Sequence, residues 1–357
     1  MLSLKPDFAK SDERYRAFWA HEIIDRPPVS GYIRKQGAMP FPKKQHATLE
    51  QRWLDIDYRV DELVAELESR VFVGDSIPLV WPNLGPELYS AWCGCGYEYG
   101  EDTTWSEPCV TDWVRDGGDK VRVNWQHPLF KTLERFTQQL LERGAGRFFV
   151  GYTDLHPGGD HLAALRNPQD LAIDMLDDLD AVKDELAASY RDFFEVYDHF
   201  YHMLDVPGNR SCSWMGDLYS EGRFGIVSND FSCMISKPMF DEVFLPGIQE
   251  ECRVFDKTIY HLDGPDALRH LDSLLAIPEL GAVQWVCGAG NEGLARWIPV
   301  YQKIQAAGKS FWLPATLKEL PLVFEHLRPE GAWISLSGLN NDEETFNAAL
   351  ARIERWA

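Results

Sequence analysis

The sequence predicts an α/β fold, namely a (β/α)₈ TIM barrel in which residues 1–357 form a single domain. Short apolar runs alternate with helical patterns, eight such units fit into the 357 residues, and no repeat or low-complexity linker divides the chain. A doubly wound open sheet is the alternative. It lacks its fingerprint, because no G-x-G-x-x-G motif follows a strand, and Gly288-Ala-Gly290 is only a fragment of one.

The predicted strands are short runs rich in β-branched and aromatic residues. In chain order they are 29–34, 71–75, 147–152, 211–215, 258–262, 282–287, 310–314 and 332–336.

The predicted helices lie between these runs, and several have start or stop signals. Ser236 with Pro238, and Asp342 before Glu344, are typical helix starts. The helices are expected at 48–69, 129–144, 169–203, 238–256, 266–276, 292–307, 317–327 and 342–356. Residues 76–128 are too long for one connection, so we expect a loop excursion after the second strand, over one mouth of the barrel.

The charge restricts the partners. The chain has 35 Lys and Arg against 56 Asp and Glu, a formal net charge of −21, which repels nucleic acids and anionic membranes. No 18-residue apolar run and no apolar secretory signal at the start is found, and the seven cysteines form an odd, scattered set. We therefore expect a cytoplasmic protein with reduced thiols that acts on a small molecule.

Polar side chains follow several predicted strands, at the barrel end where active sites lie. We expect one cavity to collect Asp75, Asp154, His156, Asp230, His261 and Asp263. His261 and Asp263 stand two apart on a strand, so both point to one face and could share a metal, or act as a base and its orienting acid. The alternative is a histidine held by a carboxylate without a catalytic role.

The other candidates have two interpretations each. Asp75 and Asp230 are catalytic carboxylates or local caps, and His156 is a site residue or a surface-loop residue. Arg34 belongs to the one cationic cluster near a strand end. Trp81, Trp214 and Trp285 are core residues or a platform for a flat substrate or a sugar, which would also suit a glycosidase.

Four segments resemble one known family in matching order. They are DRPPVSGYIRKQG (25–37), GDSIPLVWPNLGPELYSAWCGCGYEY (74–99), SNDFSCMISKPMFDEVFLP (228–246) and IYHLDGPDALRHLDSLLAIPELGAVQW (259–285). Over nearly its full length the chain is similar to the uroporphyrinogen decarboxylase superfamily, which also contains corrinoid- and thiol-dependent methyltransferases.

The resemblance implies roles for particular residues. Asp75 matches the catalytic aspartate of the decarboxylases, and Arg34 stands where they have an arginine pair. The methyltransferases hold zinc with His-x-Cys and a later cysteine. His261 matches the first ligand, Asp263 replaces the first cysteine, and Cys287 on the neighbouring strand could supply sulfur.

Three functions follow as expectations. The first is methyl transfer from a small neutral substrate to a corrinoid or thiol acceptor, with a corrinoid protein as partner and zinc at the His/Asp site. The second is a decarboxylase of a porphyrinogen-like or other carboxylated substrate that uses Asp75. The third is a non-catalytic barrel that binds a small molecule. The oligomeric state is left open between monomer and homodimer.

Overall fold

The computed structural model describes residues 2–357, and its centre is a parallel sheet of six strands. Their order across the sheet is β1-β14-β13-β12-β11-β10. The bounds are β1 (Val29–Gly31), β10 (Phe224–Ser228), β11 (Lys257–Asp263), β12 (Ala282–Val286), β13 (Ser310–Thr316) and β14 (Ala332–Ser337). The last four match predicted strands closely, since each is a long buried run between a helix and a turn.

Shorter strand pairs lie beside this sheet. They are β4 (Leu79–Val80) parallel to β7 (Phe149–Val150), and the antiparallel pairs β2 (Ile33–Arg34) with β3 (Arg70–Val71), β5 (Gly96–Tyr99) with β6 (Thr104–Glu107), and β8 (Ser211–Cys212) with β9 (Tyr219–Ser220). The amide of Gly151 donates to the Val80 carbonyl at 2.8 Å, and that of Tyr152 to the Cys212 carbonyl at 2.9 Å. The α/β class is confirmed, but residues 2–357 form one six-stranded sheet with small satellites rather than eight strands hydrogen-bonded in a ring.

The second predicted strand, 71–75, is wrong. Only its first residue is in a strand, β3, which pairs antiparallel with β2. The chain turns at Gly74, whose φ of +53° places a hypothetical Cβ 2.5 Å from the Val29 carbonyl oxygen, so a larger residue would clash. The parallel strand of this region is β4, four residues further on. The fourth predicted strand, 211–215, is also mostly absent, because only the two-residue β8 lies there. The long strand of this region is β10, at the apolar run 224–228.

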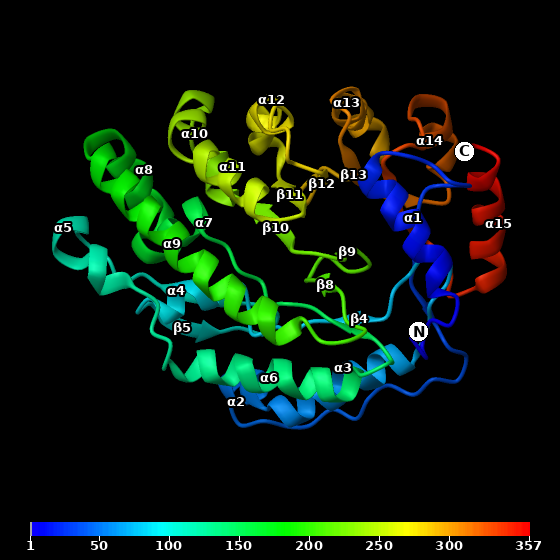
Figure 1. The fold of residues 1–357 in the computed structure, drawn as a ribbon, viewed down its shortest axis with the longest axis horizontal. Helices are drawn as coiled ribbons and strands as arrows, with labels where there is room; N and C mark the ends of the chain where they lie inside the picture. The colour runs from blue at the N-terminus through cyan, green and yellow to red at the C-terminus, as the bar shows by residue number, and fades with distance from the viewer. Residues whose placement is uncertain (1) are drawn as a thin grey trace.

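The helices form an arc around the strands, from α8 and α9 through α15 (Figure 1). Their bounds are α1 (Phe8–Ala20), α2 (Leu49–Leu54), α3 (Ile56–Glu68), α4 (Leu88–Trp92), α5 (Trp113–Asp116), α6 (Pro128–Gly144), α7 (Gly158–Arg166), α8 (Pro168–Asp177), α9 (Leu179–Leu204), α10 (Lys237–Val243), α11 (Leu245–Val254), α12 (Leu271–Leu275), α13 (Leu294–Ala306), α14 (Leu320–His326) and α15 (Glu343–Glu354). The 3₁₀ helices are η1 (Gly118–Val121), η2 (Asp230–Met234) and η3 (Pro265–His270).

Most predicted helices are present, and the predicted starts are confirmed. The Ser236 hydroxyl accepts from the Met239 amide, and the Asp342 carboxylate accepts from the amides of Glu344 and Thr345. The predicted helix 169–203 is divided at Asp178, whose side chain caps α9. In residues 2–357, no helix is long and apolar enough to cross a membrane.

Helix α1, which the sequence analysis did not predict, packs against the amino ends of the strands. The Ser310 hydroxyl, at the first residue of β13, donates to the Phe18 carbonyl at 2.6 Å. The Trp19 ring contacts Phe224, the first residue of β10, at 6.0 Å between ring centroids. This end of the sheet is therefore closed by α1, and the carboxyl ends are left for a site.

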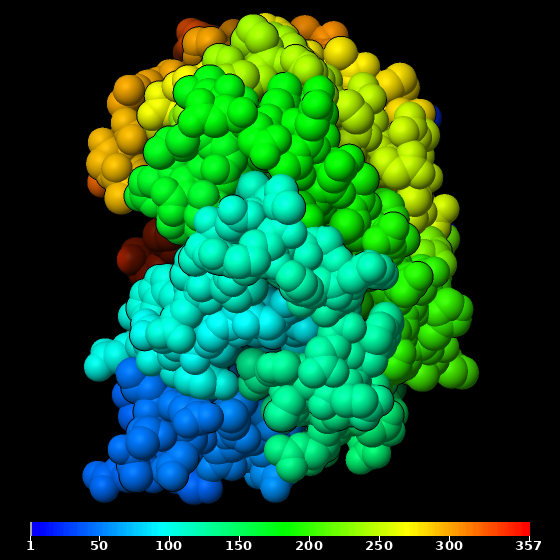
Figure 2. Space-filling view, turned by 90° about the vertical axis from the view of Figure 1, so that its left-hand side faces the viewer, coloured from blue at the N-terminus to red at the C-terminus, as the bar shows by residue number. Residues whose placement is uncertain are grey.

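The excursion after the second strand carries α4, the β5–β6 hairpin, α5 and η1. It is anchored on α7, where the amides of Cys109 and Val110 donate to the Leu165 carbonyl. Figure 2 shows its residues in cyan as a layer between the green segments and the blue ones. The predicted excursion is thus a folded part of the protein that lies beside the strand ends.

Candidate metal and substrate site

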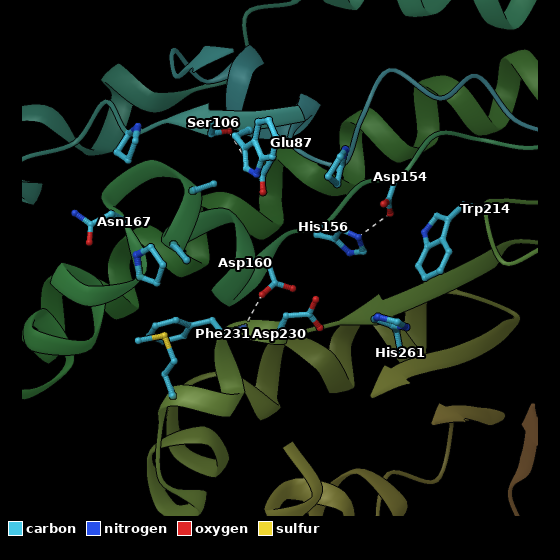
Figure 3. Close-up of a pocket in the computed structure, with 17 residues that line it drawn as sticks. Glu87, Ser106, Asp154, His156, Asp160, Asn167, Trp214, Asp230, Phe231 and His261 are labelled. Carbon is cyan, nitrogen blue, oxygen red and sulfur yellow. Dashed lines mark hydrogen bonds and ion pairs between the residues drawn. The ribbon is translucent and has the colours of Figure 1, made fainter. Parts of the chain in front are cut away.

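A cavity of about 790 Å³ lies at the carboxyl ends of the strands (Figure 3). Its walls come from the segments after β7, β8 and β10, from β11 and α7, and from the excursion. The polar and aromatic lining residues are Glu87, Trp105, Ser106, Asp154, His156, Asp160, Asn167, Trp214, Asp230, Phe231 and His261. Five predicted site residues therefore meet in one cavity: Asp154, His156, Trp214, Asp230 and His261.

Strand β11 positions His261 and Asp263. Its parallel register places His261 between Ser228 of β10 and Gln284 of β12. The Gln284 side-chain oxygen lies 2.5 Å from Nδ1 of His261. Because that oxygen is an acceptor, Nδ1 of His261 donates its proton to it, and Nε2 is the ring nitrogen left for a metal ion.

Asp230, His261 and Asp263 each offer a ligand atom, and these atoms all lie within 4.8 Å of one another. His261 and Asp263 share a strand face, and Asp230 enters from η2, which follows the adjacent β10. One imidazole nitrogen and two carboxylate oxygens suit zinc, and three protein ligands leave one position open. The donor set and its spacing fit a catalytic metal site.

A serine hydroxyl connects Asp230 to a second carboxylate. Ser228 Oγ lies 3.3 Å from Asp230 and 3.2 Å from Asp160, and Asp160 also accepts from the Phe231 amide at 2.9 Å. The protein walls desolvate Asp230 although its carboxylate is open to solvent in the cavity. This desolvation, together with the charge of Asp160, raises the pKa of Asp230 to about 6. A cation beside Asp230 would stabilise its ionised form and offset this desolvation.

His156 forms an ion pair with Asp154 across 2.6 Å. Burial is the largest single influence on His156 and lowers its pKa, but the charge and hydrogen bond of Asp154 together with the charges of Asp160 and Asp230 outweigh it, so the pKa rises to about 10. The Trp214 ring contacts both histidines, with centroids 5.3 Å from His261 and 6.4 Å from His156. The indole of Trp214 thus lies between His261 and the cationic ring of His156.

We expect Asp154→Asn to make His156 neutral at about pH 8, because burial then dominates and lowers the ring's pKa. In the wild-type protein the folded-state pKa is raised from 6.5 to about 10, so this pair stabilises the fold fully below pH 6.5 and loses its effect as the pH rises toward 10. NMR titration of the ring measures the pKa directly. A wild-type His156 ring already neutral at about pH 8 would contradict the assignment.

A second prediction concerns Gln284. We expect Gln284→Leu to weaken zinc affinity by about 10- to 100-fold, because the ring of His261 loses the group that fixes its tautomer. Gln284→Glu keeps an acceptor oxygen and should retain most of the affinity. Gln305→Leu changes a glutamine of similar burial outside the cavity lining and serves as the control in a competition titration. Equal affinity in all three variants would exclude the orienting role.

Asp75 does not lie in this cavity, and the expectation that it shares one with His261 is wrong. Its carboxylate is fully buried and accepts from Ser11 and Arg14 of α1, from Arg26, and from the amide of Val29. Val29 is the first residue of β1, so this cluster lies at the amino ends of the strands, under α1. The turn at Gly74 directs Asp75 there, away from the carboxyl ends.

Five other predicted residues lie outside the cavity lining, and one of them, Asp263, belongs to the ligand cluster beside it. Arg34 pairs with Glu66 at 3.4 Å, and Trp81 is half-buried directly after β4. Trp285 and Cys287 line a separate cavity of about 380 Å³ next to α13, where Trp285 packs on Trp297. On β12 the residue beside His261 is Gln284, so the next residue, Trp285, points to the opposite face. Cys287 does not belong to the cluster of metal-ligand atoms.

Glu87, Asp160, Ser228 and Gln284 belong to the site but are not among the residues predicted from the sequence. Asp160 lies in the same DLHPGGDH segment as His156, four residues on, at the start of α7. That spacing was a usable signal. Glu87 belongs to the excursion, and Gln284 is recognised only through the register of β11 and β12.

The sheet and the cavity define an α/β protein whose candidate site follows its parallel strands, with groups suited to holding a metal ion. Among solved structures, a methyltransferase from Methanosarcina mazei is similar to this chain, with a TM-score of 0.62, 10% identity and coverage of 99% of both chains. This likeness shows a common fold. No family model and no curated protein matches the chain.

Proposed function

We propose that this chain is a methyltransferase of the uroporphyrinogen decarboxylase superfamily, a single domain of the TIM-barrel type with its site at the carboxyl ends of the strands. In this barrel the six-stranded sheet and the short strand pairs would form an incompletely hydrogen-bonded ring. The observation that supports this proposal most directly is the cluster of Asp230, His261 and Asp263 beside a cavity of about 790 Å³. The resemblance of sequence segments and the fold of the similar methyltransferase support the same assignment. The reaction moves a methyl group from a small substrate to a corrinoid or thiol acceptor, and a corrinoid protein is the proposed partner.

Asp230, His261 and Asp263 would hold the metal, which we propose to be zinc. When bound, zinc supplies a Lewis acid that polarises a group of the substrate or acceptor in its open position. Gln284 keeps Nε2 of His261 available, and Ser228 holds the Asp230 carboxylate next to Asp160. The ligand geometry is therefore prepared by residues of β10, β11 and β12 before any ligand arrives.

The remaining lining residues bind and orient the substrate. Trp214 offers an apolar face between the two histidines, and His156 is held as a cation by Asp154. The excursion residues Glu87 and Trp105 form a further part of the cavity wall.

The decarboxylase alternative depends on Asp75, which is fully buried and neutralised by Arg14 and Arg26 at the other end of the strands. It has no path to a substrate in the cavity, so we do not favour this reaction.

The test combines metal analysis with a transfer assay. Purified protein should contain about one zinc per chain, and it should methylate a reduced corrinoid or a thiol when given methylated small molecules. Chelation should abolish turnover, and added zinc should restore it. Protein that binds substrate but shows no zinc-dependent transfer would favour the non-catalytic barrel.

A further inference from the structure

The charged side chains that line the cavity are mostly acidic. Four carboxylates line the cavity: Glu87, Asp154, Asp160 and Asp230. Of the residues that the structure describes, no lysine or arginine is part of this lining. Within the described residues 2–357, the two histidines are the only basic side chains of this lining.

Two of the four carboxylates have a counterion in this arrangement. Asp154 pairs with His156 at 2.6 Å, and Asp230 belongs to the proposed metal site. Asp160 accepts hydrogen bonds only from the Phe231 amide and the Ser228 hydroxyl. Glu87 accepts one only from the Ser106 hydroxyl, at 3.2 Å. A loaded metal site therefore still leaves two negative charges without a cationic partner in the lining.

Aromatic side chains line the same space. Phe231 stands on the side of Asp160, and Trp214 lies near the histidines (Figure 3). Trp105, next to Ser106 on β6, also lines the cavity. Trp105 is 53% exposed, and the edge of its ring lies against Gly100 in the β5–β6 turn. Aromatic faces together with carboxylates are the groups that recognise quaternary ammonium ions.

We propose that the methyl donor is a small quaternary ammonium cation, held between Asp160, Glu87 and the aromatic rings. This inference rests on the proposed function and replaces the neutral substrate expected from the sequence. A carboxylate, sulfonate or phosphate substrate would instead be repelled by the same two charges. In the transfer, the C–N bond breaks and its electron pair stays on nitrogen as a neutral tertiary amine. The methyl carbon forms its new bond with the electron pair of the reduced corrinoid or thiolate acceptor.

The test compares two ligands of equal shape on zinc-loaded protein by isothermal titration calorimetry. Choline carries the charge, and 3,3-dimethylbutan-1-ol replaces its nitrogen by carbon. We expect choline to bind at least about tenfold more tightly. Equal affinity, preference for the alcohol, or no binding of either ligand overturns the proposal.

Two substitutions locate the effect. Asp160→Asn removes one charge and should reduce the preference for choline by about tenfold, and Glu87→Gln should do the same. Asp177→Asn removes an equal charge at the exposed end of α8 and should leave the preference unchanged. A preference that survives both cavity substitutions would contradict the assignment of these residues.

The outcomes separate the two proposals. Zinc-dependent transfer without a preference for choline would support the methyltransferase and reject the cationic donor. A preference for choline without bound zinc or transfer would reject the methyltransferase and leave a cation-binding barrel.

Discussion

His261→Ala is expected to remove bound zinc and to lower methyl transfer by on the order of 10²- to 10³-fold. His261 supplies the single nitrogen of the cluster, and its ring is already oriented by Gln284. Without it, two carboxylates remain, and two oxygen ligands with no nitrogen donor are too few to hold zinc tightly. Metal analysis of purified variants and the corrinoid or thiol transfer assay measure the two effects separately.

Cys287→Ala is the matched control for this prediction. The sequence made Cys287 a candidate ligand, whereas the structure places Asp230 in the cluster and Cys287 in the neighbouring cavity. Cys287→Ala should therefore retain zinc and activity, and Asp230→Ala should lose both. Loss of zinc from Cys287→Ala together with its retention in Asp230→Ala would return the cysteine to the ligand set.

Asp75→Asn is expected to destabilise the protein by about 3–5 kcal/mol, measured as the free energy of unfolding in urea. Asp75 is fully buried, and Arg26, which is 3% exposed, donates to it. The neutral amide keeps the shape but leaves the guanidinium charge buried without its partner. Asparagine keeps a single acceptor oxygen, so either Arg26 and the Val29 amide or Ser11 and Arg14 of α1 would face an NH₂ group in place of an acceptor.

Asp25→Asn provides the comparison for Asp75. Asp25 binds the same Arg14, but its side chain is 52% exposed, so its loss should cost no more than about 1 kcal/mol. The two variants also separate the roles proposed for Asp75. A catalytic Asp75 predicts a stable but inactive Asp75→Asn protein, whereas a structural Asp75 predicts an unstable protein whose folded fraction keeps its turnover.

Much of the candidate site could be predicted from the sequence. Asp154, His156, Trp214, Asp230 and His261 each follow or end an apolar run, and all five line the cavity. The rule that worked is simple, because parallel strands end at one edge of a sheet and the residues there come together. The same rule predicts the wrong place for Asp75, because Gly74 turns the chain before a parallel strand forms.

The sequence by itself determined the α/β class, the last four strands with their helices, and the pairing of His261 with Asp263, since each depends on spacing along one segment. The tertiary structure decided which strands are neighbours, and through that register it selected Gln284 and Asp230 as companions of His261. It also decided that Asp75 pairs with α1 and that Asp160 and Glu87 face the same space as the tryptophans. These contacts join residues dozens of positions or more apart, and their formation depends on the packing of whole elements, which no local pattern encodes.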